Sequence, residues 1–175
     1  MEWINRIFDK ILALLPELAM VEPTEMGARI TMGHRYRIIG PGVYLLWPLI
    51  QRVIRMDVIT QVVDLAPQTI RTQDGHDLVV SGAIRYHISD IERALFAVQD
   101  LDKALSTLAL GVILEYVKSK TLRECEDIEA VKKELRKGVA EAASGWGVKI
   151  ETVCLTDLGR VRSIRLFGDN LRFGV

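Results

Sequence analysis

The sequence has little from which a metal site or a disulfide framework could be built. It contains two cysteines, Cys125 and Cys154, far apart and outside any CxxC pattern, whereas a structural zinc ion needs four ligands. His34, His76 and His87 are scattered, and none has a metal-binding spacing such as HExxH. The sequence therefore predicts reduced thiols, no metal and no cofactor. A cytosolic compartment fits this cysteine usage best, with a lone disulfide as the alternative.

Long apolar runs and an excess of one charge are also missing. No run approaches the roughly 20 residues that a helix needs to cross a bilayer, and the first residues lack the charge and cleavage pattern of a signal peptide. Lys and Arg number 23, as do Asp and Glu, so the formal net charge is zero. Such a chain has no long-range attraction to nucleic acid and little repulsion between copies. We expect a cytoplasmic protein that self-associates, meets any membrane peripherally, and does not bind nucleic acid.

Catalytic patterns are missing as well. The Ser81-Gly and Ser144-Gly steps are not GxSxG elbows. The acidic run at 124–129 precedes a stretch rich in Lys and Arg, which is the charge order that a helix dipole favours on a solvated face. No glycine-rich phosphate loop follows a strand. The sequence thus predicts no catalytic residues and no enzyme activity.

The first segment has the clearest helical periodicity, from Glu2 to Leu18, with Pro16 ending or bending the helix. Its apolar face must pack on lipid, on a protein partner or on the core. Its polar side is more acidic than basic, so acidic lipids would not attract it. We expect residues 1–20 to be an amphipathic helix that contacts a membrane or a partner through Trp3, Ile4, Ile7, Phe8, Ile11, Leu12 and Leu15.

Strand patterns occupy 28–89. Gly33 and the Gly40-Pro-Gly sequence mark early turns. Residues 54–62 alternate as one strand with a buried face, and 78–88 alternate more regularly still. Between them, Asp74-Gly75 predicts a hairpin turn.

Helical spacing returns at Asp90, an expected N-cap, with one apolar stripe from Ile91 to Leu101. A second helix is expected with Leu105, Leu108, Val112 and Tyr116, running to about Lys120. Thr121 and Glu124 have capping-box spacing. A further helix starts near 127 and is closed by a glycine at 145, and 148–158 reads as a final strand. These elements predict an α+β fold with mostly antiparallel strands and two or three helices.

Five motifs in this order resemble those of the band 7 (SPFH) family, which includes stomatin, prohibitin and flotillin. They are GPGVYLLWP at 40–48, IRMD at 54–57, TQDG at 72–75 with the strand at 78–88, GWGVKIE at 145–151, and LTDL at 155–158. The resemblance assigns 21–158 to a band 7 domain. Within these motifs the turn residues have architectural roles: Gly40, Pro41, Gly42, Gly145, Trp146 and Gly147.

The resemblance implies a non-enzymatic scaffold. Band 7 proteins form rings or cages on membranes, organise local lipid and protein assemblies, and restrain associated proteases and channels. In this sequence a short amphipathic helix stands where the family has a hydrophobic membrane element, and the family's long C-terminal helix does not follow Leu158. We therefore expect a minimal form without the coiled coil. The alternative is a soluble structural or assembly subunit, viral forms included, whose termini are subunit contacts.

The last segment, 159–175, is a basic and partly apolar tail. Its composition is typical of protein interfaces, which favours contact with another subunit or an anionic partner over nucleic acid. A solvated tail is the alternative. The expected contact residues are Arg160, Arg162, Arg165, Phe167 and Arg172.

Overall fold

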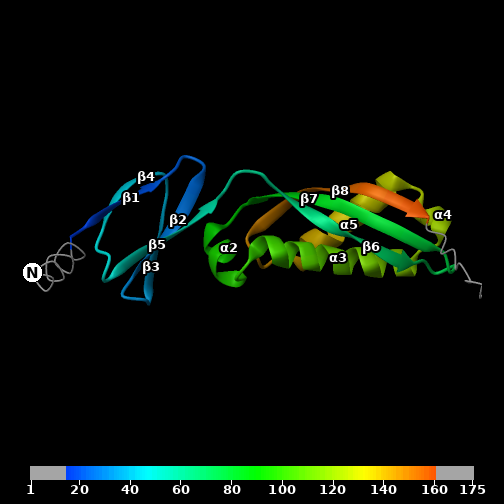
Figure 1. Cartoon of the computed structure of the whole chain (residues 1–175), viewed down its shortest axis with the longest axis horizontal. Helices are drawn as coiled ribbons and strands as arrows, with labels where there is room; N and C mark the ends of the chain where they lie inside the picture. The colour runs from blue at the N-terminus through cyan, green and yellow to red at the C-terminus, as the bar shows by residue number, and fades with distance from the viewer. Residues whose placement is uncertain (1–14, 161–175) are drawn as a thin grey trace, which may run out of the picture.

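The computed structural model describes residues 15–160, which form an elongated α+β protein with two lobes. The first, here the β-lobe, contains β1 (Glu17–Val21), β2 (Glu25–Thr31), β3 (Arg35–Ile39), β4 (Gly42–Leu46) and β5 (Gln51–Asp57). The second, the α/β lobe, contains β6 (Gln61–Arg71), β7 (Asp77–Ile88), α2 (Ile91–Ala97), α3 (Leu101–Ser119), α4 (Leu122–Cys125), α5 (Ile128–Ala142) and β8 (Val148–Arg160). The lobes lie end to end, with β1 starting at one end of the molecule and β8 finishing at the other (Figure 1). The predicted α+β class is confirmed.

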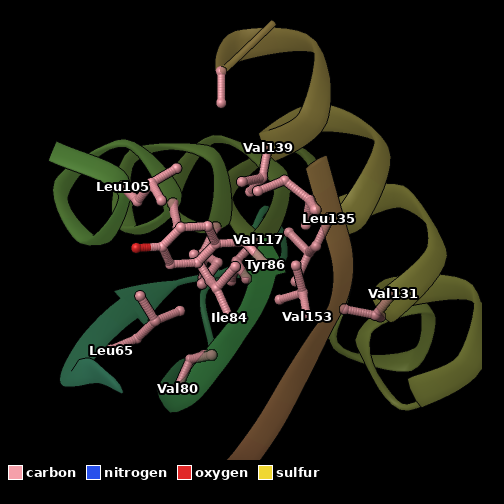
Figure 2. Packing of buried hydrophobic residues seen from close by; sticks show 14 of the residues in the cluster. Leu65, Val80, Ile84, Tyr86, Leu105, Val117, Val131, Leu135, Val139 and Val153 are labelled. Atoms are coloured by element: carbon pink, nitrogen blue, oxygen red, sulfur yellow. The ribbon is translucent and has the colours of Figure 1, made fainter. Parts of the chain in front are cut away.

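The main core lies in the α/β lobe, between the antiparallel sheet β6-β7-β8 and the helices α3 and α5. Strand β7 supplies its centre because every second residue faces the helices. Leu78, Ile84 and Tyr86 are each no more than 2% exposed. Side chains from α3 and α5, such as Leu105 and Leu135, pack onto this row (Figure 2). The predicted alternation of β7 is therefore confirmed.

Local signals fix the ends of several elements as the sequence predicts. Asp90 Oδ1 accepts hydrogen bonds from the backbone N–H groups of Glu92 and Arg93, at 3.1 and 3.2 Å, and so caps α2. At α4 the backbone N–H of Thr121 donates to Glu124 Oε2 at 2.9 Å, the reciprocal bond of a capping box. These bonds use donors that a helix start otherwise leaves unpaired.

The β-lobe is built from two small sheets. Strand β1 pairs antiparallel with β4, and β2 lies between β3 and β5. Few side chains are fully buried there: Val21, Ala28, Ile30, Ile39 and Leu46. A lobe with so small a core leaves much of its apolar surface outside.

Three sequence-based boundaries are wrong. Residues 17–21 form β1, so the expected helix cannot reach Leu18; Pro16 lacks a backbone donor, and the chain after it pairs with β4. The single strand predicted at 54–62 is two strands, β5 and β6, interrupted at 58–60 as the chain passes between lobes. Leu101 starts α3 instead of continuing α2, because Asp100 Oδ1 caps α3 through the backbone N–H of Lys103 at 3.1 Å.

Polar and aromatic contacts join the two lobes. The rings of Tyr36 in β3 and Phe96 in α2 have centroids 4.8 Å apart, and Tyr36 Oη donates a hydrogen bond to Glu92 Oε1 at 2.5 Å. That carboxylate raises the pKa of Tyr36. Thr60, in the segment between lobes, donates to Glu151 Oε1 at 3.1 Å. The β-lobe is thus attached to the α/β lobe through β3 and α2 as well as through the chain itself.

Candidate docking surface

Exposed apolar side chains are concentrated in the β-lobe. Of the fifteen large apolar residues that are exposed among residues 15–160, twelve lie within 15–59. Solvent-facing hydrophobic residues are ordinary when scattered, whereas a contiguous group on a small lobe marks an interaction surface.

The register of β1 and β4 places four of these side chains on one face. Leu18 lies opposite Leu45, and Met20 lies opposite Val43. Residues directly opposite each other share a face of the sheet, as do residues two apart along a strand. Their exposed fractions range from 54% for Leu45 to 69% for Leu18. We call these four residues the apolar strip.

The turns at the outer end of the β-lobe add a second apolar group, which we call the apolar tip. It consists of Met32 in the β2–β3 turn and Trp47, Leu49 and Ile50 in the β4–β5 connection. The backbone N–H of Met32 donates to the carbonyl of Ile50 at 2.7 Å, which holds the two turns together. A shallow cleft lined by Ile30, Pro48 and Arg52 lies between the turns. The tip continues the strip along the chain, because Val43 and Leu45 in β4 are followed by Trp47 and Leu49 in the connection to β5.

The neighbouring sheet of the β-lobe carries several arginines. Arg29 in β2 lies directly opposite Arg37 in β3, and Arg35 lies on the same face two residues nearer the tip. Arg55 of β5 donates through Nη1 to the carbonyl of Met20 at 2.9 Å, which ties the two sheets of the lobe together. From Met26 to Met56 the chain has five arginines and neither Asp nor Glu.

The sequence-predicted contacts divide between the described and undescribed parts of the chain. Leu15 is 55% exposed and precedes β1, and Arg160 is the last residue of β8, at the far end of the molecule (Figure 1). The remaining predicted contacts lie outside the described residues: Trp3, Ile4, Ile7, Phe8, Ile11, Leu12, Arg162, Arg165, Phe167 and Arg172.

Five of the six predicted turn residues occupy connections, and Gly42 begins β4. Tyr44 Oη donates to the carbonyl of Gly40 at 2.9 Å, which braces the turn at 40–42. After α5 the residue with a left-handed backbone is Gly147, with φ of 69°, and not Gly145. Trp146 between them packs partly buried against the main core.

Sequence reasoning missed the apolar strip. The helical periodicity from Glu2 to Leu18 assigned Leu18 to the amphipathic helix, and Val43 and Leu45 fall within the GPGVYLLWP motif, which indicates a turn and not an open face. Which face of β1 and β4 stays open depends on their pairing, which no local pattern reveals.

Elsewhere within residues 15–160, the polar groups form structural contacts. A cavity of about 640 Å³ lies at the lobe junction and is lined by Gln61, Asp100, Lys103 and other residues. Tyr86 Oη donates to Asp102 Oδ1 at 2.5 Å beside this cavity, and burial, with that carboxylate, raises the pKa of Tyr86. A phenol whose ionisation is suppressed is a structural donor and not a base. Within 15–160, no three His, Cys, Asp or Glu side chains are grouped to hold a metal ion.

Among residues 15–160, no helix combines the length and apolar character needed to cross a bilayer.

Comparison with known proteins identifies relatives along most of the chain. The family described as "SPFH domain / Band 7 family" matches residues 19–161. An uncharacterised protein of Methanocaldococcus jannaschii is 24% identical over 164 residues, covering 93% of this chain and 82% of that protein. Mouse stomatin is 26% identical over 120 residues, covering 68% of this chain and 42% of stomatin.

A putative band 7 family protein of Acanthamoeba polyphaga mimivirus is 23% identical over 127 residues, covering 72% of this chain and 42% of that protein. This chain therefore spans less than half the length of the latter two relatives. The resemblance drawn from the sequence motifs is confirmed.

Proposed function

This chain belongs to the SPFH domain / Band 7 family, and from that membership we propose that it is a non-enzymatic, oligomerising scaffold that docks on a membrane surface through its β-lobe. The observation that carries the docking is the open apolar strip, Leu18, Met20, Val43 and Leu45, continued by the apolar tip. The similarity to stomatin supports a membrane-associated scaffold in general terms.

The energetics favour shallow, reversible docking. Burying one Leu-sized or Met-sized side chain contributes about 1.5–3 kcal/mol, so a strip of four gives the order of affinity of a single acyl anchor, whose binding is marginal and reversible. Trp47, next to the strip, is of the type enriched at the membrane–water boundary because its ring is amphipathic.

Oligomerisation would convert weak docking into stable attachment. In a ring or cage every subunit presents its own strip to the same membrane, so the binding events become intramolecular and their affinities multiply. Strands β6 and β8 are the outer strands of the main sheet, and such edges can pair with another copy. The terminal segments, 1–20 and 159–175, are proposed as additional contacts.

Vesicle flotation tests the docking. We expect wild-type protein to float with vesicles and the Leu18→Glu/Leu45→Glu variant to remain at the bottom, since two carboxylates on the strip oppose insertion. Ile128→Glu is the matched control: Ile128 is also exposed, at 46%, but begins α5 in the other lobe. The same assay on the Ile7→Glu/Ile11→Glu variant measures how much the N-terminal segment contributes to vesicle binding. Failure of the wild type to float would overturn lipid docking.

A second candidate function is a soluble structural or assembly subunit whose apolar strip packs on another copy. The acidic bias of the first 25 residues favours it, because those residues gain nothing from acidic lipid. Mass photometry or light scattering without lipid separates the two candidates. Loss of the oligomer in Leu18→Glu/Leu45→Glu would assign the strip to a subunit interface, and a strictly monomeric wild type would exclude both.

A further inference from the structure

We propose that the face formed by Arg29, Arg35 and Arg37, here the arginine face, binds the phosphates of anionic lipid headgroups, so that docking selects acidic membranes. This inference rests on the proposed function and specifies its lipid class. It follows from three features of the β-lobe: the strand register, the distribution of charge along the chain, and the depth of the arginines behind the apolar tip.

The register creates an electrostatic conflict that a bound anion would relieve. Arg29 lies directly opposite Arg37 on neighbouring strands, and like charges in that position destabilise a sheet. Arg35, two residues from Arg37, adds a third positive charge on the same face. Within residues 15–160, none of the three guanidinium groups has a carboxylate within 4.0 Å.

On this face of the sheet the acidic residues lie at the other end, where Glu25 pairs with Asp57, four residues along β2 from Arg29. The protein as a whole balances its charges, yet the 26–56 segment is purely basic. All five of its cations are arginines, and a guanidinium group matches the oxygens of a phosphate through paired hydrogen bonds. The acidic residues of the N-terminal segment, which acidic lipid would repel, lie before residue 26.

The depth of the arginines fits a membrane interface. Arg35 directly follows the β2–β3 turn that carries Met32, and Arg37 and Arg29 form the next row but one, about 7 Å farther from the turn at 3.3 Å per residue. The headgroup layer on each side of a bilayer is of the same order, about 5–7 Å thick. With the apolar tip at the hydrocarbon boundary, the arginine face lies among the phosphates.

Flotation with two kinds of vesicle tests the inference: phosphatidylcholine alone, and phosphatidylcholine mixed with phosphatidylglycerol. We expect wild-type protein to bind the mixed vesicles at least tenfold more tightly, with an advantage that fades as salt rises. Arg35→Gln/Arg37→Gln should bind mixed vesicles roughly thirtyfold more weakly than wild type, about fivefold per charge. Its binding to phosphatidylcholine should stay unchanged.

The matched control is Lys133→Gln/Lys137→Gln, which removes two exposed charges from α5 in the other lobe and should behave as wild type. The melting temperature shows whether Arg35→Gln/Arg37→Gln is folded. Because the variant removes like charges, we expect its melting temperature to equal or exceed that of the wild type.

The possible failures separate this inference from the proposed function. Equal wild-type binding to both vesicles, or equal behaviour of the arginine and lysine variants, would overturn lipid selection and leave docking intact. No binding to either vesicle would overturn both. A change in particle mass without lipid in Arg35→Gln/Arg37→Gln would assign the arginine face to an acidic segment of a second copy instead.

Discussion

Asp74, at the tip of the β6–β7 hairpin, accepts a hydrogen bond through Oδ2 from the backbone N–H of Leu122, the first residue of α4, at 3.1 Å. Next to it, the backbone N–H of Gln73 donates to the carbonyl of Lys120 at 2.9 Å. Thr72, the one buried polar residue identified within 15–160, donates through Oγ1 to Asp74 Oδ1. The Asp-Gly turn that sets the hairpin register therefore also anchors the junction between α3 and α4.

Replacing Asp74 by Ala should destabilise the protein through this junction. The helix start loses an acceptor for its first N–H group, and the Thr72 hydroxyl loses one of its two acceptors, keeping the carbonyl of His76. We expect the melting temperature to fall by several degrees, together with faster hydrogen exchange at the start of α4. The control is Asp64→Ala, an exposed carboxylate in the middle of β6, which should leave both measurements unchanged. Equal effects of the two variants would contradict a specific role for Asp74.

Stability should fall at acid pH partly through the same junction. The hydrogen bond from Thr72 holds the pKa of Asp74 below its usual value of 3.8, and the backbone N–H of Thr121 holds the pKa of Glu124 below 4.5. A carboxylate with a lowered pKa in the folded state stabilises the fold above its unfolded pKa, and that stability is lost as pH falls through the folded value. Their contribution is therefore complete above about pH 5 and declines below about pH 4.

Urea unfolding from about pH 6 to about pH 3 measures this decline. Asp77 and Glu151 also have lowered pKa values, through Arg71 and His87 respectively, so the double variant Asp74→Asn/Glu124→Gln should flatten the pH dependence in part and not abolish it. An unchanged pH profile would exclude the junction as a source of acid sensitivity.

Gly147 should tolerate no side chain, in contrast to Gly145. Its φ of 69° is unfavourable for other residues, and an added Cβ would collide with the carbonyl oxygen of Asp90 and the backbone N of Ala94. We expect Gly147→Ala to cost roughly 2 kcal/mol or more. At Gly145 an added Cβ meets no atom within 4 Å, so Gly145→Ala should change stability little. Comparable unfolding midpoints for the two variants would refute this assignment.

The contact between Tyr36 and Phe96 should hold the β-lobe at a fixed angle to the α/β lobe. Tyr36→Ala removes the aromatic pair, worth about 0.5–1.5 kcal/mol, as well as the bond to Glu92, whereas Tyr36→Phe removes only the bond. We expect a broader distance distribution between fluorophores on the two lobes for Tyr36→Ala, and a near-native one for Tyr36→Phe. Identical distributions in both variants and in wild type would show that the pair does not restrain the lobes.

Local sequence was sufficient to predict the elements that are specified by periodicity, caps or turns within a few residues. The alternation from Leu78 to Ile88 predicts β7 and its buried face, because one side of the strand needs to be apolar wherever helices cover it. Asp90 and the Thr121–Glu124 pair predict helix starts, since capping bonds span only two or three residues. Asp74-Gly75 predicts the hairpin turn for the same reason, although its bond to Leu122 spans 48 residues.

In other segments the structure depends on pairing with residues far away in the chain. Helical periodicity ran through Leu18, but β4 pairs with residues 17–21 and converts them to a strand. Alternation continued past Val58, but the chain leaves one lobe for the other there, so no single sheet could hold the segment. The left-handed residue after α5 is Gly147 instead of Gly145, because the carbonyl of Gly147 accepts the backbone N–H groups of Ser89 and Asp90, each at 2.9 Å.

The sequence by itself determined the fold class, the family resemblance and the order of the elements from β7 onward, because periodicity, caps and turns are encoded by neighbouring residues. Only the tertiary structure placed Leu18 beside Leu45 and Arg29 opposite Arg37. Strand register brings together residues that are far apart in the chain. No local pattern could show that four apolar side chains share an open face, or that arginines line the sheet beside them.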